Sequence, residues 1–388
     1  MDSRLLWLAL AAFVGAVEGG SIAGLLPLVS EDMGVSIGQA GWLVLGYSLA
    51  YAIGTPLLAV LLGGVGRRRI LAGAEFGLAV CALLMAITPF FEGLVAMRTL
   101  LAVAAGTFTG TAMATAAMIA PIGQRGRYMQ VISMGQSLAA LIGVPMATWV
   151  AAQVSWRVDY LAIAAMAAAA SLALYLRLPR GMPGDTQTMR DRMRAIRNPG
   201  VLPALLANLL LMIGATPLMI YIGAIMVAAG IGIDMLPLVL LAGGIGALAC
   251  SFSAGRIADH LGNRTAGTLM GLAIIVVLGA FAALPYLPAD WLLPALLVIS
   301  GLQGYVIWAF TIAVASQLAH LAPKSVPVAI SLNMSAFNIG MAIAAAAGGI
   351  IADSFGAGVL PIAGVPMVMA ALLVWRLVPT DPPATSGT

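Results

Sequence analysis

Long apolar stretches with almost no charge run through this sequence and leave few folds open to it. Of the 388 residues, 62% are hydrophobic and only 8% are charged, against about 25% charged residues in a typical soluble domain. So few charges cannot cover a surface that faces water, and lipid must therefore surround most of the chain. Runs such as residues 166–176, MAAAASLALYL, do not alternate as barrel strands do, which favours helices as the spanning elements.

Twelve of these stretches match the length of a membrane span, which takes about 20 mostly apolar residues. The first is expected to be an uncleaved helix, because its apolar run is too long for a signal-peptide core and no small-residue cleavage site ends it. The sequence therefore predicts an all-α polytopic membrane protein. Its predicted spans cover residues 5–29, 40–63, 70–91, 93–121, 128–152, 157–177, 200–229, 234–255, 265–285, 291–316, 326–350 and 357–377.

The charged residues between the spans give the chain an orientation. All of the 18 lysines and arginines except Arg98 and Arg157 fall on one side, and the opposite loops hold acids such as Asp32 and Asp159. By the positive-inside rule the basic side is cytoplasmic, so both termini are expected in the cytoplasm and the protein in a plasma (bacterial inner) membrane. The net charge of +4 is spread over short loops, which argues against nucleic acid as a partner.

A repeat divides the chain into two halves. The longest polar stretch, residues 178–199, separates six predicted spans from six, and an offset of 196 residues places Gly66 on Gly262 in matching basic loops. Two repeats of the same orientation are typical of transporters that hold their cargo between the halves. The predicted domains are an N-terminal bundle at 1–178, a cytoplasmic linker at 179–199 with a surface helix at 186–197, a C-terminal bundle at 200–378 and a cytoplasmic tail at 379–388.

The basic loop of the second half carries a family resemblance. Residues 255–264, GRIADHLGNR, resemble the Gly-x-Leu-Ala-Asp-Arg-x-Gly-Arg-Arg loop of the major facilitator superfamily. In the first half, residues 66–69 keep the basic end of that loop, but Gly63 stands where the family pattern has an aspartate. The resemblance implies gating by charge contacts that hold one face of the bundles closed. The residues implied in this role are Arg67, Arg68, Gly255, Arg256, Asp259, Gly262 and Arg264.

Further segments resemble one branch of this superfamily. Residues 18–27, EGGSIAGLLP, together with Tyr47, look like the opening of the drug:proton antiporter-1 group. Residues 143–157 resemble its fifth span and the turn after it, and residues 331–340 resemble its eleventh span. Within the group, the sugar and arabinose efflux permeases are the best match. The resemblance implies a major facilitator fold of two six-helix bundles and proton-coupled efflux.

Two charges within the predicted spans are candidates for handling the coupling proton. At a helix rise of about 1.5 Å per residue, Glu18 lies about 20 Å and Arg98 about 22 Å from the inner face. The two side chains can therefore share one level, where pairing offsets much of the cost of desolvation. Related antiporters place an acid in span one and an arginine in span four, which implies that Glu18 binds and releases the proton. The alternative is a static interhelical ion pair.

Glu75 is a third ionisable residue within a predicted span. It lies about 8 Å from the inner face of span three by the same helix rise. We expect it to form a structural or gating ion pair with one of the arginines at 67–69 or 125–127. A direct role in transport is the alternative.

Several polar and aromatic side chains at intermediate depth can line a cargo cavity. Each polar group needs a hydrogen-bond partner in lipid, so bonding between helices is the alternative for any one of them. The aromatic rings can stack on a ring or a sugar face, or serve only in packing. The predicted cavity residues are Gln136, Asn208, Tyr221, Gln303, Trp308, Asn333 and Asn338.

Motifs for other chemistry are missing from the sequence. It contains no Gly-x-x-x-x-Gly-Lys-Ser/Thr phosphate loop, no His-Glu-x-x-His and no metal-ligand cluster, so we expect no enzyme activity, no cofactor and no metal. The leading hypothesis is a monomeric, proton-coupled transporter in the lipid bilayer that exports a sugar, a nucleoside or a drug-like solute by alternating access. An uptake symporter or facilitator is one alternative, and a non-transporting membrane receptor or scaffold is another.

Overall fold

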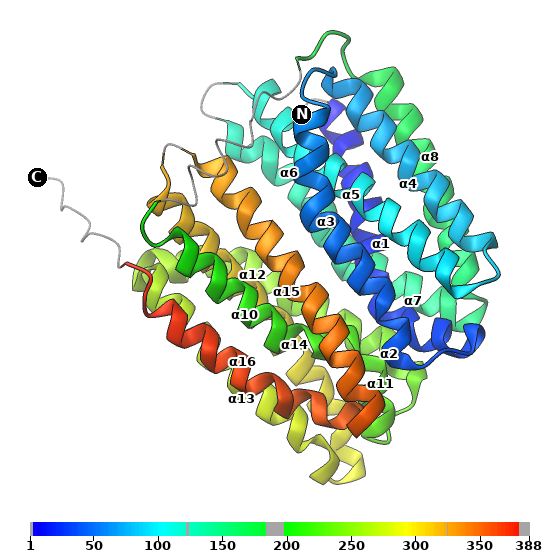
Figure 1. The fold of residues 1–388 in the computed structure, drawn as a ribbon, viewed down its shortest axis with the longest axis vertical. Helices are drawn as coiled ribbons and strands as arrows, with labels where there is room; N and C mark the ends of the chain where they lie inside the picture. The colour runs from blue at the N-terminus through cyan, green and yellow to red at the C-terminus, as the bar shows by residue number, and fades with distance from the viewer. Residues whose placement is uncertain (1–2, 122–123, 184–197, 324, 380–388) are drawn as a thin grey trace, which may run out of the picture. The chain divides into compact units, whose positions relative to one another are not determined.

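The computed structural model describes residues 3–121, 124–183, 198–323 and 325–379, with residues 3, 125, 126, 255, 259 and 327 described by their backbone alone. Within these ranges all the regular elements are helices, drawn in Figure 1. Helices suit a lipid environment because they pair the polar groups of the backbone within each segment. The predicted surface helix at 186–197 and residues 380–388 of the predicted tail lie outside the described residues.

The first half of the chain forms six helical segments long enough to span a membrane. Two of them are interrupted, one by a turn at Gly41 and one by a π-helical turn. The elements are α1 (Ser3–Met33), α2 (Ile37–Ala40), α3 (Trp42–Leu61), α4 (Arg67–Ile87), α5 (Phe91–Ile119), α6 (Arg125–Leu138), the π-helical turn Ala139–Gly143, α7 (Val144–Gln153) and α8 (Trp156–Arg177).

The second half forms six more segments of spanning length among the described residues. A break at Tyr221 follows Pro217 by one turn and separates α10 from α11. Short 3₁₀ turns lie at Ile233–Met235, Leu284–Tyr286 and Ala357–Val359. The helices are α10 (Val201–Ile220), α11 (Ile222–Ala228), α12 (Leu236–Leu261), α13 (Asn263–Ala283), α14 (Ala289–Leu321), α15 (Val326–Phe355) and α16 (Leu360–Trp375).

The prediction of twelve spans is confirmed, because twelve described segments are long and apolar enough to cross a membrane. Their limits differ from the predicted ones by a few residues. The first helix reaches Met33, so Glu31 and Asp32 lie in its last turn and not in the predicted loop. It ends where Gly34 has a φ of +65°, a left-handed conformation that glycine adopts without steric cost and that commonly ends helices.

The 196-residue repeat is visible in the helix boundaries. α4 covers Arg67–Ile87 and α13 covers Asn263–Ala283, so both helices have 21 residues and they begin 196 positions apart. Each of them follows a glycine of the matching loops, Gly66 or Gly262. Equal length of this helix pair, at the offset found in the sequence, supports two copies of one six-span unit.

The fifth span is irregular where it packs against α1. The π-helical turn Ala139–Gly143 comes just before Pro145, which has no N–H to donate to the carbonyl four residues earlier and so disrupts regular helix. A Cβ atom at Gly24 of α1 would lie 2.2 Å from Thr148 Oγ1 of α7. Only glycine fits this contact, and it holds α7 close to the helix that carries Glu18.

α4 and α8 lie side by side in Figure 1 and pack closely along their lengths. Ser171 Oγ on α8 donates to the Ala72 carbonyl oxygen on α4 at 2.8 Å. The Arg68 guanidinium on α4 lies 4.5 Å from the ring centroid of Tyr175 on α8. Arg68 pairs with Tyr175, and Ala72, four residues later on α4, pairs with Ser171, four residues earlier on α8. The two helices therefore run antiparallel in this register.

Packing contacts divide the chain into two compact units. The first contains Met1–Gln187 and Asp234–Leu241, and the second contains Thr188–Ile233 and Ala242–Thr388. The division at residue 187 falls within the predicted linker, but the limits predicted for the two bundles stay a prediction. The first turns of α12 group with the first unit, which the repeat in the sequence does not predict.

Candidate functional site

An ion pair lies buried inside the first unit. Glu18 on α1 and Arg98 on α5 are 0% and 1% exposed, and Arg98 Nη1 donates to Glu18 Oε1 at 2.5 Å. The two charges lie at one level, as their estimated depths suggest, whereas their role in proton coupling stays a prediction. Because each charge is the other's partner, their attraction offsets much of the cost of removing both from water.

Two tyrosines that the sequence does not single out as site residues complete this arrangement. Arg98 Nη1 also donates to the Tyr160 hydroxyl oxygen on α8 at 2.6 Å. The Arg98 guanidinium lies 5.0 Å from the ring centroid of Tyr47 on α3. The charge-assisted hydrogen bond and the cation–π contact hold the arginine in one orientation. Four helices of the first unit therefore meet at this one side chain.

Two polar atoms of the ion pair lack a partner. Glu18 Oε2 and Arg98 Nε are buried and make no hydrogen bond to any described residue. Most buried polar atoms are hydrogen-bonded, and an exception needs a physical or functional reason. Glu18 Oε2 can accept a proton while Oε1 keeps its bond to Arg98. The site can therefore change its charge and keep its geometry.

Asp159 is a second acid next to this pair. It lies in the first turn of α8 and is 5% exposed, so the prediction that it belongs to an outer loop is wrong. Its Oδ2 has no hydrogen-bond partner among the described residues, and it interacts electrostatically with both Glu18 and Arg98. It directly precedes Tyr160, whose hydroxyl oxygen accepts a hydrogen bond from Arg98.

A cluster of three side chains ties the end of α1 to the start of α8. Asp32 forms an ion pair with Arg157 and accepts a hydrogen bond from Trp156 Nε1 at 3.1 Å. The Arg157 guanidinium lies 4.2 Å from the Trp156 ring centroid. Arg157 is one of the two basic residues that depart from the charge pattern, and the contact with Asp32 gives it a local partner. The cluster therefore connects α1, which carries Glu18, to α8, which carries Tyr160.

The ion pair expected for Glu75 is not found among the described residues. Glu75 is 0% exposed, and neither of its carboxyl oxygens has a hydrogen-bond partner there. The candidate arginines on α4 have other contacts, since Arg67 Nε donates to the Pro183 carbonyl oxygen at 3.0 Å and Arg68 stacks on Tyr175. Arg67 and Arg68 thus contact the segment after α8 and the Tyr175 ring of α8 rather than Glu75.

The matching loop of the second unit is held by backbone contacts. Arg264 Nη2 donates to the Arg376 carbonyl oxygen at 2.6 Å, and Trp375 Nε1 donates to the Arg264 carbonyl oxygen at 3.0 Å. Gly262 has a φ of +78°, which explains why glycine stands there. Arg256 is exposed. The gating roles predicted for Gly255 and for the Asp259 side chain fall outside the described residues, because only their backbone is described.

Three of the predicted cavity residues of the second unit, Asn208, Tyr221 and Asn333, make hydrogen bonds between helical segments. Asn208 Nδ2 on α10 donates to Asn333 Oδ1 on α15 at 2.9 Å, and Tyr221 OH donates to the Ala345 carbonyl oxygen of α15 at 2.6 Å. These bonds join helices, as the alternative interpretation expects. However, Asn208 Oδ1 and Asn333 Nδ2 lack partners among the described residues. The amide pair therefore keeps one free acceptor and one free donor.

The remaining cavity candidates are spread over three helices. Gln303 on α14 is 8% exposed, and its Nε2 has no partner among the described residues. Asn338 Nδ2 donates within α15 to the Met334 carbonyl oxygen at 2.9 Å. The remaining two are Trp308, which is 43% exposed and stacks on Phe337 at 6.0 Å between ring centroids, and Gln136, which is half-buried on α6.

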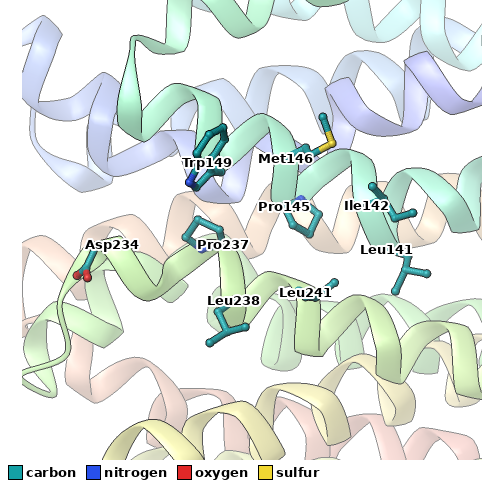
Figure 2. A pocket seen from close by; sticks show the side chains of 9 residues that line it. All are labelled: Leu141, Ile142, Pro145, Met146, Trp149, Asp234, Pro237, Leu238 and Leu241. Carbon is teal, nitrogen blue, oxygen red and sulfur yellow. The ribbon is translucent and has the colours of Figure 1, made fainter.

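An open pocket of about 460 Å³ lies between α7 and the start of α12, within the first unit. Figure 2 shows side chains from the two helices facing one another across it. Its lining is apolar apart from Asp234, and it contains neither Glu18 nor Arg98. The lining residues are Leu141, Ile142, Pro145, Met146, Trp149, Asp234, Pro237, Leu238 and Leu241.

Comparisons with known proteins agree with this architecture. The model of the family described as Major Facilitator Superfamily matches residues 8–319. The chain is 30% identical over 379 residues to an inner membrane transport protein, YdhP, of Escherichia coli, covering 95% of this chain and 94% of the relative. It is 28% identical to a chloramphenicol resistance protein of Streptomyces lividans, over 91% of this chain and 88% of the relative.

Solved structures share the fold at low sequence identity. The nucleoside transporter NupG matches with a TM-score of 0.78 at 12% identity, covering 97% of this chain and 99% of the other. A D-xylose-proton symporter matches with a TM-score of 0.75 at 15% identity, covering 97% of each chain. At these identities the likeness shows a common twelve-helix fold, and it carries no information on cargo.

Proposed function

We propose that this chain, which belongs to the Major Facilitator Superfamily, is a proton-coupled secondary transporter that exports a small organic solute. Members of this family are transporters of small solutes and not enzymes, and the chain is a multi-pass inner-membrane protein of that kind. Proton coupling, direction and cargo are the proposed parts. In alternating access, a cargo site is exposed to one side of the membrane at a time.

The observation that carries the proposal is the buried pair of Glu18 and Arg98. Ionisable groups in a membrane span are costly and usually functional. Glu18 keeps one carboxyl oxygen free, so it can take up a proton without leaving Arg98. A proton on Glu18 weakens the attraction that holds Arg98, and movement of Arg98 in turn changes the affinity of Glu18 for the proton. This reciprocity is the coupling that a proton-driven transporter needs.

Export is supported by a relative that bears the name of a chloramphenicol resistance protein. For cargo contact we propose the predicted cavity residues, with the free acceptor of Asn208 and the free donors of Asn333 and Gln303 as the leading polar groups. Such atoms favour a cargo with both donors and acceptors. Arg67, Arg256 and Arg264 are proposed to stabilise one closed state through loop contacts.

Transport into proteoliposomes tests coupling and direction together, with chloramphenicol as the first probe. We expect vesicles with an acidic lumen in alkaline buffer to accumulate the probe, because protons that leave exchange for cargo that enters. Accumulation only with the opposite gradient would mean symport, and accumulation with neither gradient across a panel of sugars, nucleosides and amphipathic drugs would support a receptor or scaffold. Protein-free vesicles are the control.

Both termini are proposed to lie in the cytoplasm, because the basic loops and both ends of the chain fall on one side of the predicted spans. We expect a fluorescent protein fused after Thr388 to fluoresce, and alkaline phosphatase fused at the same place to be inactive. The phosphatase should be active when it is fused after Pro89, between α4 and α5. The opposite pattern at the two positions would reverse the proposed orientation.

A further inference from the structure

Glu75 is the buried acid that the proposed mechanism does not use. It lies in the middle of α4, is 0% exposed, and has no hydrogen-bond partner for either carboxyl oxygen among the described residues. Its neighbours one turn away on α4, Leu71, Leu78 and Ala79, are all buried. The first unit therefore encloses a carboxyl group to which none of its described residues makes a hydrogen bond.

The helices packed against α4 present apolar side chains at this level. The register set by Ser171 on Ala72 places Ala167 of α8, which is buried, nearest to the level of Glu75. Ser171 lies about one turn nearer the basic end, where its hydroxyl group donates to the Ala72 carbonyl oxygen. On α5, Ala104 lies 3.7 Å from a Cβ built at Gly77, so the adjoining turn of α5 presents Ala105 and Phe108, which are buried. On α1, Ala11 and Ala12 belong to the same apolar core as Leu71 and Ala72.

The titratable and charged groups of these helices lie at other levels. On α1 the nearest is Glu18, which is paired with Arg98 of α5. On α8 the nearest on the basic side is Tyr175, which lies under Arg68. On α4 itself, Arg67–Arg69 lie about 9 Å or more along the helix, at about 1.5 Å per residue. None of the described groups is therefore a counter-ion for Glu75.

Glu75 lies between the ion pair and the basic end of α4. Gly15 of α1 is level with Leu78 of α4, where a Cβ would come 4.0 Å from Leu78 Cδ1. Since both helices lead away from the basic loops, Glu18 is level with Cys81. Glu75 then lies six residues closer to Arg67–Arg69, about 9 Å along the axis.

An ionised carboxylate in such a place carries a large desolvation penalty that none of the described groups offsets. A metal ion would need several oxygen ligands, and no cluster of three potential ligand residues occurs among the described residues. The ligand that one isolated carboxyl group can bind by itself is a proton. A proton removes the charge and needs no second ligand.

We propose that Glu75 is a second proton-binding site of the first unit, which is occupied in the conformation described here and exchanges its proton with water when the helices around it move. Binding adds one proton to the carboxylate, and release returns it to the aqueous phase at the end of the unit that bears Arg67–Arg69. The use of this site in transport rests on the proposed proton coupling, whereas the binding of the proton does not.

Infrared difference spectroscopy of the full-length protein in lipid nanodiscs tests the site without any cargo. A film of these nanodiscs is perfused alternately with neutral and alkaline buffer, and the experiment is done once in ordinary water and once in deuterium oxide. We expect the wild type to show a C=O stretching band of a carboxylic acid in an apolar environment, which falls in alkaline buffer, returns at neutral pH and shifts in deuterium oxide. The Glu75→Gln variant should lose that band completely, and Glu18→Gln should retain it.

Two control variants test whether the band is assigned correctly to Glu75. Glu31→Gln replaces an exposed acid of α1 and should leave the band unchanged. Glu75→Asp should move the band to a different frequency without removing it, and this variant serves if Glu75→Gln does not fold. Glutamine has the shape of a neutral glutamic acid, so the unfolding temperature of a folded Glu75→Gln variant should be close to that of the wild type.

Two results would overturn the proposal. A band that Glu75→Gln leaves unchanged would show that Glu75 is ionised. A Glu75 band that persists in alkaline buffer and does not exchange with deuterium would show a permanently bound proton of structural importance only. Neither result bears on Glu18, and a failure of gradient-driven transport would leave the infrared assignment of Glu75 intact.

Discussion

Replacement of Glu18 by glutamine is expected to abolish gradient-driven transport while the protein remains folded. With one proton exchanged for each neutral cargo molecule, a gradient of one pH unit supplies about 1.4 kcal/mol, which supports about tenfold accumulation. Glutamine cannot take up or release a proton at physiological pH, so the variant should only equilibrate the probe across the membrane. The measurement is steady-state accumulation in proteoliposomes at matched protein density.

The structure indicates why Glu18→Gln should fold. The glutamine side chain has nearly the same shape and keeps an oxygen that can accept the bond from Arg98 Nη1. Arg98 also keeps its hydrogen bond to Tyr160 and its contact with the Tyr47 ring. Exchange of labelled for unlabelled probe without a gradient should therefore continue, which separates a coupling defect from loss of the fold.

The matched control for this experiment is Glu31→Gln. Glu31 lies on the same helix but is exposed near its end, so its loss should leave accumulation unchanged. If Glu18→Gln accumulates the probe as well as the wild type does, the proton is carried elsewhere and Glu18 serves only as part of a static ion pair. If it loses exchange as well, Glu18 is needed for cargo binding or for folding.

The spans could be predicted from the sequence because hydrophobic length decides them. The same composition hides how each helix is rotated about its axis, since a span that is apolar all round does not mark its inward face. Depth along the helix could be estimated, and this was enough to match Glu18 with Arg98. The rotation of each helix about its axis could not be estimated from the sequence. For that reason the contacts of Arg98 with Tyr47 and Tyr160 were not predicted.

Glu75 and Asp159 show the same difference for charged residues within the spans. Sequence reasoning gave Glu75 an arginine partner because its estimated depth is close to the basic residues at 67–69 and 125–127. In the structure Arg67 contacts the backbone of the segment after α8, and Arg68 lies against the Tyr175 ring. The same reasoning placed Asp159 in a loop together with the other acids on the side opposite the basic loops. In the structure Asp159 lies in the first turn of α8 and is buried, as is Tyr160, which accepts a hydrogen bond from Arg98.

The neutral polar residues of the second unit were predicted as a set, and the structure distinguishes among them. The Tyr221 hydroxyl group donates a hydrogen bond to a carbonyl oxygen of α15. The Asn338 side chain donates one to a carbonyl oxygen of its own helix. Asn208 and Asn333 bind each other and still leave one polar atom each without a partner. Residue type and depth cannot distinguish a polar side chain that joins helices from one that is available to cargo, because both need the same chemistry at the same level.

Replacement of Arg98 by alanine is expected to cause a large loss of stability. Alanine would leave the Glu18 carboxylate buried without its partner, and it would also remove the donor to Tyr160 and the cation next to Tyr47. Breaking one side of a buried ion pair costs about 3–5 kcal/mol in the free energy of unfolding. Equilibrium unfolding of the purified protein in mixed micelles should show a loss of this size.

The contribution of the pair can be separated from the other contacts of Arg98 by a double-mutant cycle. Arg98→Ala combined with Glu18→Gln removes the unpaired charge, so the double variant should be more stable than Arg98→Ala alone. Arg157→Ala is the matched control, because its ion pair with Asp32 joins side chains that are 32% and 44% exposed and should contribute only about 0–1 kcal/mol. Equal losses for Arg98→Ala and Arg157→Ala, with no recovery in the double variant, would mean that burial gives the Glu18 pair no special strength. The reciprocal effect that links Arg98 to the proton affinity of Glu18 would then have no energetic basis.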